Sequence, residues 1–216
     1  MSKFGTSIFL NHSILIAAVI AAIRFKKMDK SFYPFIAFIT LSLLNESLSL
    51  LLIYKTGSNA FNSNIYVLIE YFIILFQFYK WKNDGPSTYL LFAVLGLVIW
   101  VADNMVIHSL YQNNSIFRIF YSLVILFFAI DATNWVITFS TGSVLKNPIF
   151  LISTTFLLFF SCKTFIEIFN VFETRLSIAF YERIWQSFSV INFIANIIYA
   201  IAVLCIPKKQ EFIFQY

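Results

Sequence analysis

The chain has 216 residues, of which 60% are hydrophobic and only 12% are charged, and its mean hydropathy is +0.84. An average soluble domain has about 25% charged residues, so this composition excludes a water-soluble globular protein. The formal charge of +5 comes from basic residues in short connections between apolar stretches, which is typical of membrane proteins, and we expect no nucleic-acid partner. The two cysteines, Cys162 and Cys205, fall in different apolar stretches and do not indicate a disulfide framework.

Seven apolar stretches, each about long enough to cross a bilayer, occupy nearly the whole chain. They lie at about residues 7–25, 32–54, 64–80, 88–107, 115–139, 148–172 and 177–206. They are much longer than the roughly ten-residue strands of a membrane barrel and lack strand-like alternation, so they are predicted to be helices. All four prolines fall at or just outside their ends. The predicted fold is therefore an all-α seven-transmembrane-helix bundle in the lipid bilayer, with residues 1–216 forming a single domain.

The distribution of basic residues predicts which side of the membrane each end of this bundle faces. Nine of them follow the first, third, fifth and seventh stretches, whereas the opposite side holds only Lys3, Lys55 and Arg175. By the positive-inside rule the N-terminus is expected outside and the C-terminus in the cytoplasm. The first stretch is predicted to be a retained helix and not a cleaved signal peptide, because its basic cluster follows the apolar run.

Polar residues recur at helical spacing in four of the stretches. In chain order these stripes are Ser42, Asn45, Glu46 and Ser49; Ser63, Glu70 and Gln77; Lys163, Glu167 and Asn170; and Glu182, Gln186, Ser189 and Asn196. A charge inside the bilayer costs at least about 3 kcal/mol unless it is paired or faces water. Four such faces on otherwise apolar helices indicate that the helices turn them toward one another or toward a hydrated space.

With the N-terminus outside, most of these charges fall in the outer half of the membrane, which predicts an outward-facing pocket there. The predicted ligand-binding residues are Asn45, Glu46, Glu70, Arg118, Lys163, Glu167, Glu182, Arg183, Gln186 and Asn196. We expect Glu70 or Glu167 to form a hydrogen-bonded ion pair with one of the three cations in this set, within the outer half of the bundle. Two simpler interpretations remain open: polar side chains that only join helices, at about 0.6 kcal/mol each, and solvation for Glu182 and Arg183 near the membrane surface.

The chain lacks the motifs of several membrane enzymes and photoreceptors. A catalytic zinc ion usually takes three protein ligands, commonly histidines, and the only histidines are His12 and His108. No HExxH, GxSxG, Walker or GxGxxG motif is present, and the last stretch has no lysine for a retinal Schiff base. We therefore expect no metal, no cofactor and no catalytic residue, and an intramembrane enzyme ranks third among the functions considered.

Three segments carry a resemblance to known proteins. They are Leu43-Leu-Asn-Glu-Ser-Leu-Ser-Leu-Leu-Leu, Asn64-Ile-Tyr-Val-Leu-Ile-Glu-Tyr-Phe and Trp185-Gln-Ser-Phe-Ser-Val-Ile-Asn-Phe-Ile-Ala-Asn-Ile-Ile-Tyr. They resemble a group of small bacterial seven-helix membrane proteins that are usually called hypothetical. The residues that look shared are Glu46, Tyr66, Glu70, Asn192, Asn196 and Tyr199. The resemblance implies a multi-pass fold in the bacterial inner membrane, and it implies no activity.

Two functions fit these features best. The first is a sensor or receptor-like module that binds a small polar or cationic ligand in the outer pocket and signals through a separate cytoplasmic partner, because the connections are too short to hold an output domain. The second is a translocator of a small solute, an ion or protons that uses Glu46, Glu70 and Glu167. A sealed apolar inner half favours the sensor, whereas a polar path to the cytoplasm favours transport.

Overall fold

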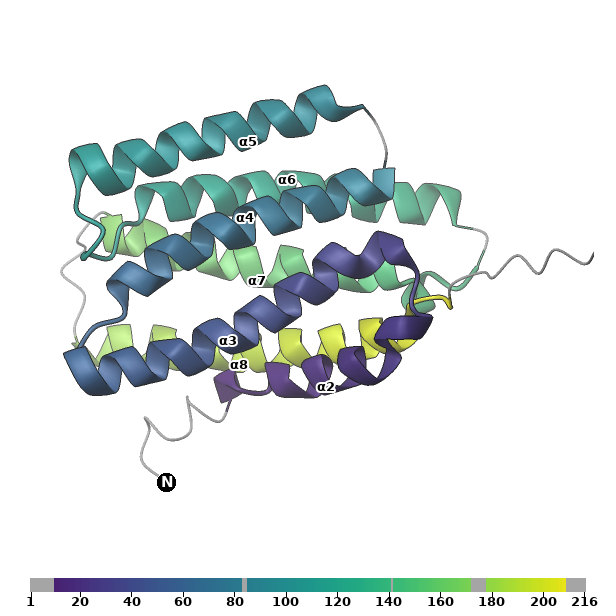
Figure 1. Ribbon diagram of the computed structural model, residues 1–216, viewed down its shortest axis with the longest axis horizontal. Coiled ribbons are helices and arrows are strands. Elements are labelled where there is room, and N and C mark those ends of the chain that lie inside the picture. The colour runs from purple at the N-terminus through teal and green to yellow at the C-terminus, as the bar shows by residue number, and fades with distance from the viewer. Residues whose placement is uncertain (1–9, 83–84, 141, 172–177, 209–216) are drawn as a thin grey trace, which may run out of the picture.

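The computed structural model describes residues 10–82, 85–140, 142–171 and 178–208, which form seven α-helices. The helices are α2 (Ile14–Arg24), α3 (Tyr33–Thr56), α4 (Ala60–Lys82), α5 (Pro86–Val101), α6 (Ile116–Phe139), α7 (Pro148–Val171) and α8 (Ile178–Cys205) (Figure 1). Short 3-10 turns lie in the α2–α3 and α6–α7 connections. Within the described ranges the chain forms no β-strand, only an isolated antiparallel bridge between Met28 and Lys208. The expected all-helical fold is confirmed.

Six of these helices are long and apolar enough to cross a membrane, which supports a multi-pass membrane protein. They are residues Lys30–Thr56, Ala60–Lys82, Pro86–Ile107, Ile116–Phe139, Pro148–Val171 and Glu182–Cys205. Their bounds agree with the expected stretches to within about five residues, because prolines and polar turns end each helix. The first expected stretch, residues 7–25, begins outside the described residues, and its described helix α2 has 11 residues.

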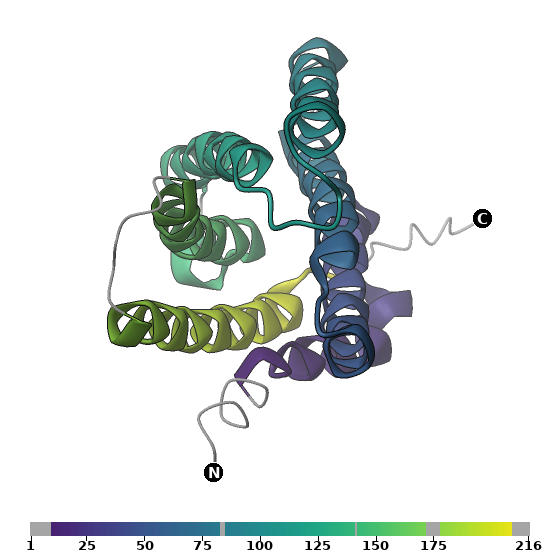
Figure 2. The same ribbon diagram turned by 90° about the vertical axis from the view of Figure 1, so that its left-hand side faces the viewer.

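Six helices form a closed ring, and the seventh lies outside it. Around the ring each helix contacts the next in the order α2, α3, α4, α6, α7, α8 and back to α2. Helix α5 packs against α4 and α6 on the outside of the ring, as the view along the bundle shows (Figure 2). We call the end with the α3–α4 and α5–α6 connections the pocket end, and the opposite end, with the α2–α3 and α6–α7 connections, the packed end.

Helix α5 approaches α4 closely at Gly96. The ring of Tyr71 on α4 occupies the space in which a side chain at position 96 would begin, and the Tyr71 hydroxyl donates a hydrogen bond of 2.6 Å to the carbonyl oxygen of Phe92. Glycine is therefore required here for its small volume. This explains why the only glycine inside a predicted span lies on the helix outside the ring.

Helix α5 ends in one π-helical turn, Ala102–Ile107, that brings a buried carboxylate to the start of α6. Asp103 accepts hydrogen bonds of 2.8 Å from the backbone N–H of Phe117 and from Nδ1 of His108. The first N–H groups of a helix lack partners within the helix, and a negative charge is favourable at that end. Asp103 therefore serves as a cap for α6 and fixes the α5–α6 connection at the pocket end.

The packed end of the ring is filled with aromatic side chains. We call Phe35, Phe38, Phe78, Phe156 and Tyr199 the aromatic layer, and all five are buried. Their neighbouring ring centroids lie 5.4–6.1 Å apart, mostly in edge-to-face arrangement, which is the favoured geometry for aromatic pairs. The layer joins α3, α4, α7 and α8 and fills the interior of the ring at this level with aromatic side chains.

Polar side chains at the packed end satisfy backbone groups at helix termini. Gln77 accepts a hydrogen bond of 2.7 Å from the N–H of Phe35 and donates one of 2.7 Å to the carbonyl oxygen of Ser31. Arg24 donates hydrogen bonds of 2.6 and 3.1 Å to the carbonyl oxygens of Val203 and Ile206 at the end of α8. Gln77 belongs to a predicted polar stripe, but its role in the structure is to cap α3.

Candidate functional site

A cavity of about 770 Å³ lies within the ring at the pocket end. Residues of all six ring helices line it, together with residues of the connections before α4 and α6. It reaches the pocket end at Asn59 and Asn113, and its floor is formed by Phe38 and Tyr199 of the aromatic layer. Small-molecule sites in proteins typically have about 300–1,000 Å³, so the cavity has room for an organic ligand.

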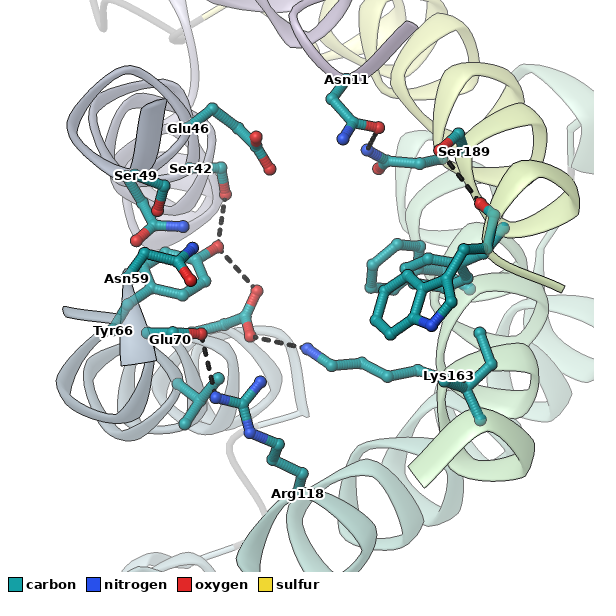
Figure 3. A pocket seen from close by; sticks show the side chains of 18 of the residues that line it. Asn11, Ser42, Glu46, Ser49, Asn59, Tyr66, Glu70, Arg118, Lys163 and Ser189 are labelled. Carbon is teal, nitrogen blue, oxygen red and sulfur yellow. Dashed lines mark hydrogen bonds and ion pairs between the residues drawn. The ribbon is translucent and has the colours of Figure 1, made fainter. Parts of the chain in front are cut away.

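Glu70 is the centre of a hydrogen-bonded cluster that spans the cavity (Figure 3). Its carboxylate accepts hydrogen bonds from the hydroxyls of Tyr66 at 2.8 Å and Tyr121 at 3.0 Å. The ammonium of Lys163 lies 3.7 Å from the same carboxylate and donates a hydrogen bond to the Tyr121 hydroxyl. Ser42 lies 2.9 Å from the Tyr66 hydroxyl. Since these residues come from α3, α4, α6 and α7, the cluster connects four helices of the ring.

Lys163 also lies over aromatic rings. Its ammonium is 4.9 Å from the centroid of Tyr121 and 5.7 Å from those of Phe159 and Phe160. A cation over the face of such rings is attracted by their negative face. The lysine charge is therefore held by a carboxylate, a hydroxyl and three rings, all supplied by the protein.

Glu167 is the second carboxylate with a full set of protein partners. It accepts hydrogen bonds of 2.6 Å from the Ser115 hydroxyl and 3.1 Å from the Asn170 amide. The guanidinium of Arg118 lies 3.8 Å away. These contacts hold the end of α7 against the start of α6 and neutralise the Glu167 charge.

The guanidinium of Arg118 makes further contacts with α4 and with its own helix. It donates hydrogen bonds to the Ser63 hydroxyl at 2.9 Å, to the Asn64 side-chain oxygen at 3.0 Å and to the carbonyl oxygen of Asn114 at 3.0 Å. Asn64 is itself buried and donates to two carbonyl oxygens of the α5–α6 connection. Arg118 thus joins α4, α6 and α7 around the mouth of the cavity.

Glu46 differs from the other two carboxylates of the cavity. It lies on α3, and its carboxylate points into the cavity from the helix wall (Figure 3). Within the described part of the chain, no hydrogen bond or ion pair is formed by this carboxylate.

The structure brings together most of the predicted ligand-binding residues. Those that line the cavity are Asn45, Glu46, Glu70, Arg118, Lys163, Glu167 and Asn196. The predicted charge pairing occurs twice, in Lys163 with Glu70 at 3.7 Å and in Arg118 with Glu167 at 3.8 Å, but neither pair is directly hydrogen-bonded as was expected. In the first pair the Tyr121 hydroxyl lies between the two charges as a hydrogen-bonded link.

The structure places the other three predicted ligand-binding residues, Glu182, Arg183 and Gln186, outside the cavity. All three are exposed and do not line it. On α8 the lining begins at Trp185. Further along this helix, the amides of Asn192 and Asn196 donate hydrogen bonds to Asn11 and Ser13, just before α2.

Sequence reasoning missed two partners of the carboxylates on α6, Ser115 and Tyr121. Together with Arg118 they are spaced three residues apart, so all three lie near one face of the helix. This spacing was the available signal. Tyrosines in membrane helices usually lie at the lipid–water interface. A tyrosine that serves instead as a buried hydrogen-bond donor, such as Tyr121, is therefore easily overlooked in the sequence.

Comparisons with protein-family models, with curated proteins and with solved structures found no match. The resemblance to small bacterial seven-helix proteins therefore stays a prediction. In the part of the chain that the structure describes, no group of three or more His, Cys, Asp or Glu side chains is placed to hold a metal ion. The function must be argued from the cavity alone.

Proposed function

We propose that the chain is a seven-helix membrane sensor whose cavity opens to the outside and binds a small polar or cationic ligand. In this proposal the N-terminus lies outside, the packed end faces the cytoplasm, and a separate cytoplasmic protein reads the signal. The basic residues near the packed end, such as Lys26, Lys80 and Lys146, support this orientation through the positive-inside rule.

The observation that carries the proposal is the contrast between the polar cavity at the pocket end of the ring and the aromatic layer at its packed end. The cavity ends at Phe38 and Tyr199, and beyond them the aromatic layer is buried and closely packed. A pocket that is polar on one side and sealed on the other suits a molecule that enters, binds and leaves by the same side. Translocation would require a second, polar opening through the layer.

Helix α8 supplies a physical route from the pocket to the cytoplasmic side. It has 28 residues and is therefore about 42 Å long at 1.5 Å per residue. Its middle part, from Trp185 to Tyr199, lines the cavity. Its end is held to Arg24 at the end of α2 and, by a hydrogen bond of 3.1 Å from Asp29 to Pro207, to the α2–α3 connection. A ligand that shifts the middle of α8 would move this connection at the packed end.

Cysteine accessibility separates the sensor from the alternative, a translocator. With Cys162 and Cys205 replaced by serine, Asn45→Cys places a thiol in the cavity, and Ala202→Cys places one beyond the aromatic layer at a fully buried position. We expect a membrane-impermeant thiol reagent to label the first thiol from outside and to label the second from neither side. Labelling of the second thiol would show that the layer opens and would favour transport.

The same assay tests the proposed orientation. Cysteines at Ser58 and Ser87 are exposed at opposite ends of the bundle. In intact cells the impermeant reagent should label position 58 and spare position 87 until the membrane is permeabilised. The reverse pattern would place the cavity on the cytoplasmic side.

A further inference from the structure

We infer that the ligand is a small organic cation and that Glu46 is the residue that holds its positive charge. This inference rests on the proposed function, because it assigns the chemical class of the molecule that enters the same cavity. The inference depends on which charged side chains of the cavity already have partners within the protein and which one has none.

The charges that line the cavity are three carboxylates and two permanent cations. Glu70 and Glu167 each have a cation within 4 Å and two hydrogen-bond donors. Their capacity as acceptors is already used to join helices. Neither carboxylate needs a ligand to offset its charge.

The two cations also bind groups of the protein. The guanidinium of Arg118 donates to three oxygens of the protein besides its pair with Glu167. The ammonium of Lys163 is held by Tyr121 and Glu70 and lies over three rings. An anionic ligand would have to break these contacts, so the cavity offers no ready site for a negative group.

Glu46 is the remaining charge. Its carboxylate faces the cavity and has no hydrogen-bond or ion-pair partner among the described residues. An uncompensated charge in a membrane protein is costly, and a cation bound beside it would supply the missing partner. The arrangement therefore selects for positive charge at one defined place on the cavity wall.

The rest of the lining favours an organic cation over a metal ion. Metal sites gather several convergent oxygen or nitrogen ligands, and among the described residues no three His, Cys, Asp or Glu side chains are placed together to hold one. The cavity wall instead carries aromatic side chains on α7 and α8, among them Phe159, Trp185 and Phe188. A carboxylate together with aromatic faces is suited to an alkylammonium group, which combines charge with apolar surface.

A charge-matched series of three probes tests this inference on the purified full-length protein in lipid nanodiscs. The probes are choline, its uncharged carbon analogue 3,3-dimethylbutan-1-ol, and the anion 3,3-dimethylbutanoate, which have similar size and shape. Binding is measured by calorimetry and by the shift in melting temperature. We expect saturable binding of choline, with an affinity at least about thirtyfold above that of either analogue, the factor that corresponds to about 2 kcal/mol for one buried charge contact.

Two variants and one control assign the effect to Glu46. Glu46→Gln removes the charge and should abolish the preference for choline while leaving binding of the uncharged analogue unchanged. Glu46→Asp keeps the charge and should retain part of the preference, so the test does not depend on one variant folding. Glu182→Gln removes an exposed carboxylate at the same end of the bundle but outside the cavity, and it should bind all three probes as the unmodified protein does.

The outcomes separate this inference from the proposed function. Saturable binding of the anion or of the uncharged analogue, with no preference for choline, would overturn the cationic class and leave a ligand-binding pocket. A preference for choline that survives in Glu46→Gln would show that another group holds the charge. Failure of all three probes to bind would overturn the inference, whereas the proposed sensor is tested independently by the cysteine-accessibility assay.

Discussion

The pocket half and the packed half of the ring use polar side chains in opposite ways. In the packed half, Gln77 and Arg24 bind backbone groups at helix ends, and aromatic rings fill the interior. In the pocket half, Glu70, Lys163 and Glu167 meet other side chains around a space of about 770 Å³. The same chain therefore fills its interior with rings in one half and leaves it open and charged in the other.

The packed half stabilises the bundle, whereas the pocket half holds the proposed binding site. An unfilled space forfeits dispersion contacts, and a buried ion pair is often no more stabilising than apolar residues of the same volume. Stability alone would therefore favour a second aromatic layer in place of the cavity. The cavity therefore adds little to stability, and ligand binding there is the role that we propose for it.

The largest expected effect comes from breaking a charge pair in the pocket half. Lys163→Ala leaves Glu70 without its cation, and removing one partner of a buried pair costs about 3–5 kcal/mol. The double variant Lys163→Ala/Glu70→Gln should lose less, because the neutral amide can still accept from Tyr66 and Tyr121. Unfolding of the detergent-solubilised protein measures both. Equal melting of the single and double variants would show that the two charges are not coupled.

The next effect comes from opening the aromatic layer. Phe156→Ala removes a fully buried ring that contacts Phe38, Phe78 and Tyr199, and we expect a loss of about 3 kcal/mol, as for other buried phenylalanines. Phe165 lies on the same helix and is 64% exposed, so Phe165→Ala is the matched control and should cost much less. Similar losses at both positions would mean that the layer is not closely packed.

A smaller effect is expected where α5 meets the ring. Gly96→Ala forces the Tyr71 ring to move and should destabilise the protein by about 2 kcal/mol, which is typical of overpacking. Gly142 has open space around its Cα, and Gly142→Ala should leave the melting temperature almost unchanged. If Gly96→Ala melts like the unmodified protein, then α5 packs against α4 less closely than described.

The smallest effect is expected for the charge pair at the packed end. Lys82 and Asp131 lie 2.7 Å apart, but their side chains are 28% and 40% exposed. Exposed pairs contribute at most about 1 kcal/mol, so Asp131→Asn should lower stability by less than that, and high salt should remove the difference. A loss as large as that of Lys163→Ala would show that exposure does not distinguish the two pairs.

The helices could be predicted from the sequence because length, apolar composition and proline position determine where a membrane helix begins and ends. The position of α5 outside the ring was not predicted. Residues 88–107 lack a polar stripe, but so do the expected stretches at residues 7–25 and 115–139, whose helices α2 and α6 lie in the ring. A missing stripe therefore does not identify the outer helix.

The candidate site was predicted in part, and α8 shows why. Its stripe at Glu182, Gln186, Ser189 and Asn196 has one helical phase, yet only the last two residues are buried. Periodicity gives the direction in which side chains point, whereas burial also depends on where the neighbouring helices end. The positions at which neighbouring helices end are a property of the tertiary structure, so they could not be predicted from the spacing of polar residues.

Closure of the ring joins the first and the last of the described helices. The partners of Arg24 and Ser13 at α8 lie about 180 residues further along the chain. During synthesis α2 is therefore made long before α8, and the Arg24 guanidinium and the Ser13 hydroxyl lack these partners until then. Insertion of α8 closes the ring. A chain truncated before α8 would have an open lateral edge and unsatisfied polar groups, and we expect it to be degraded by membrane quality control.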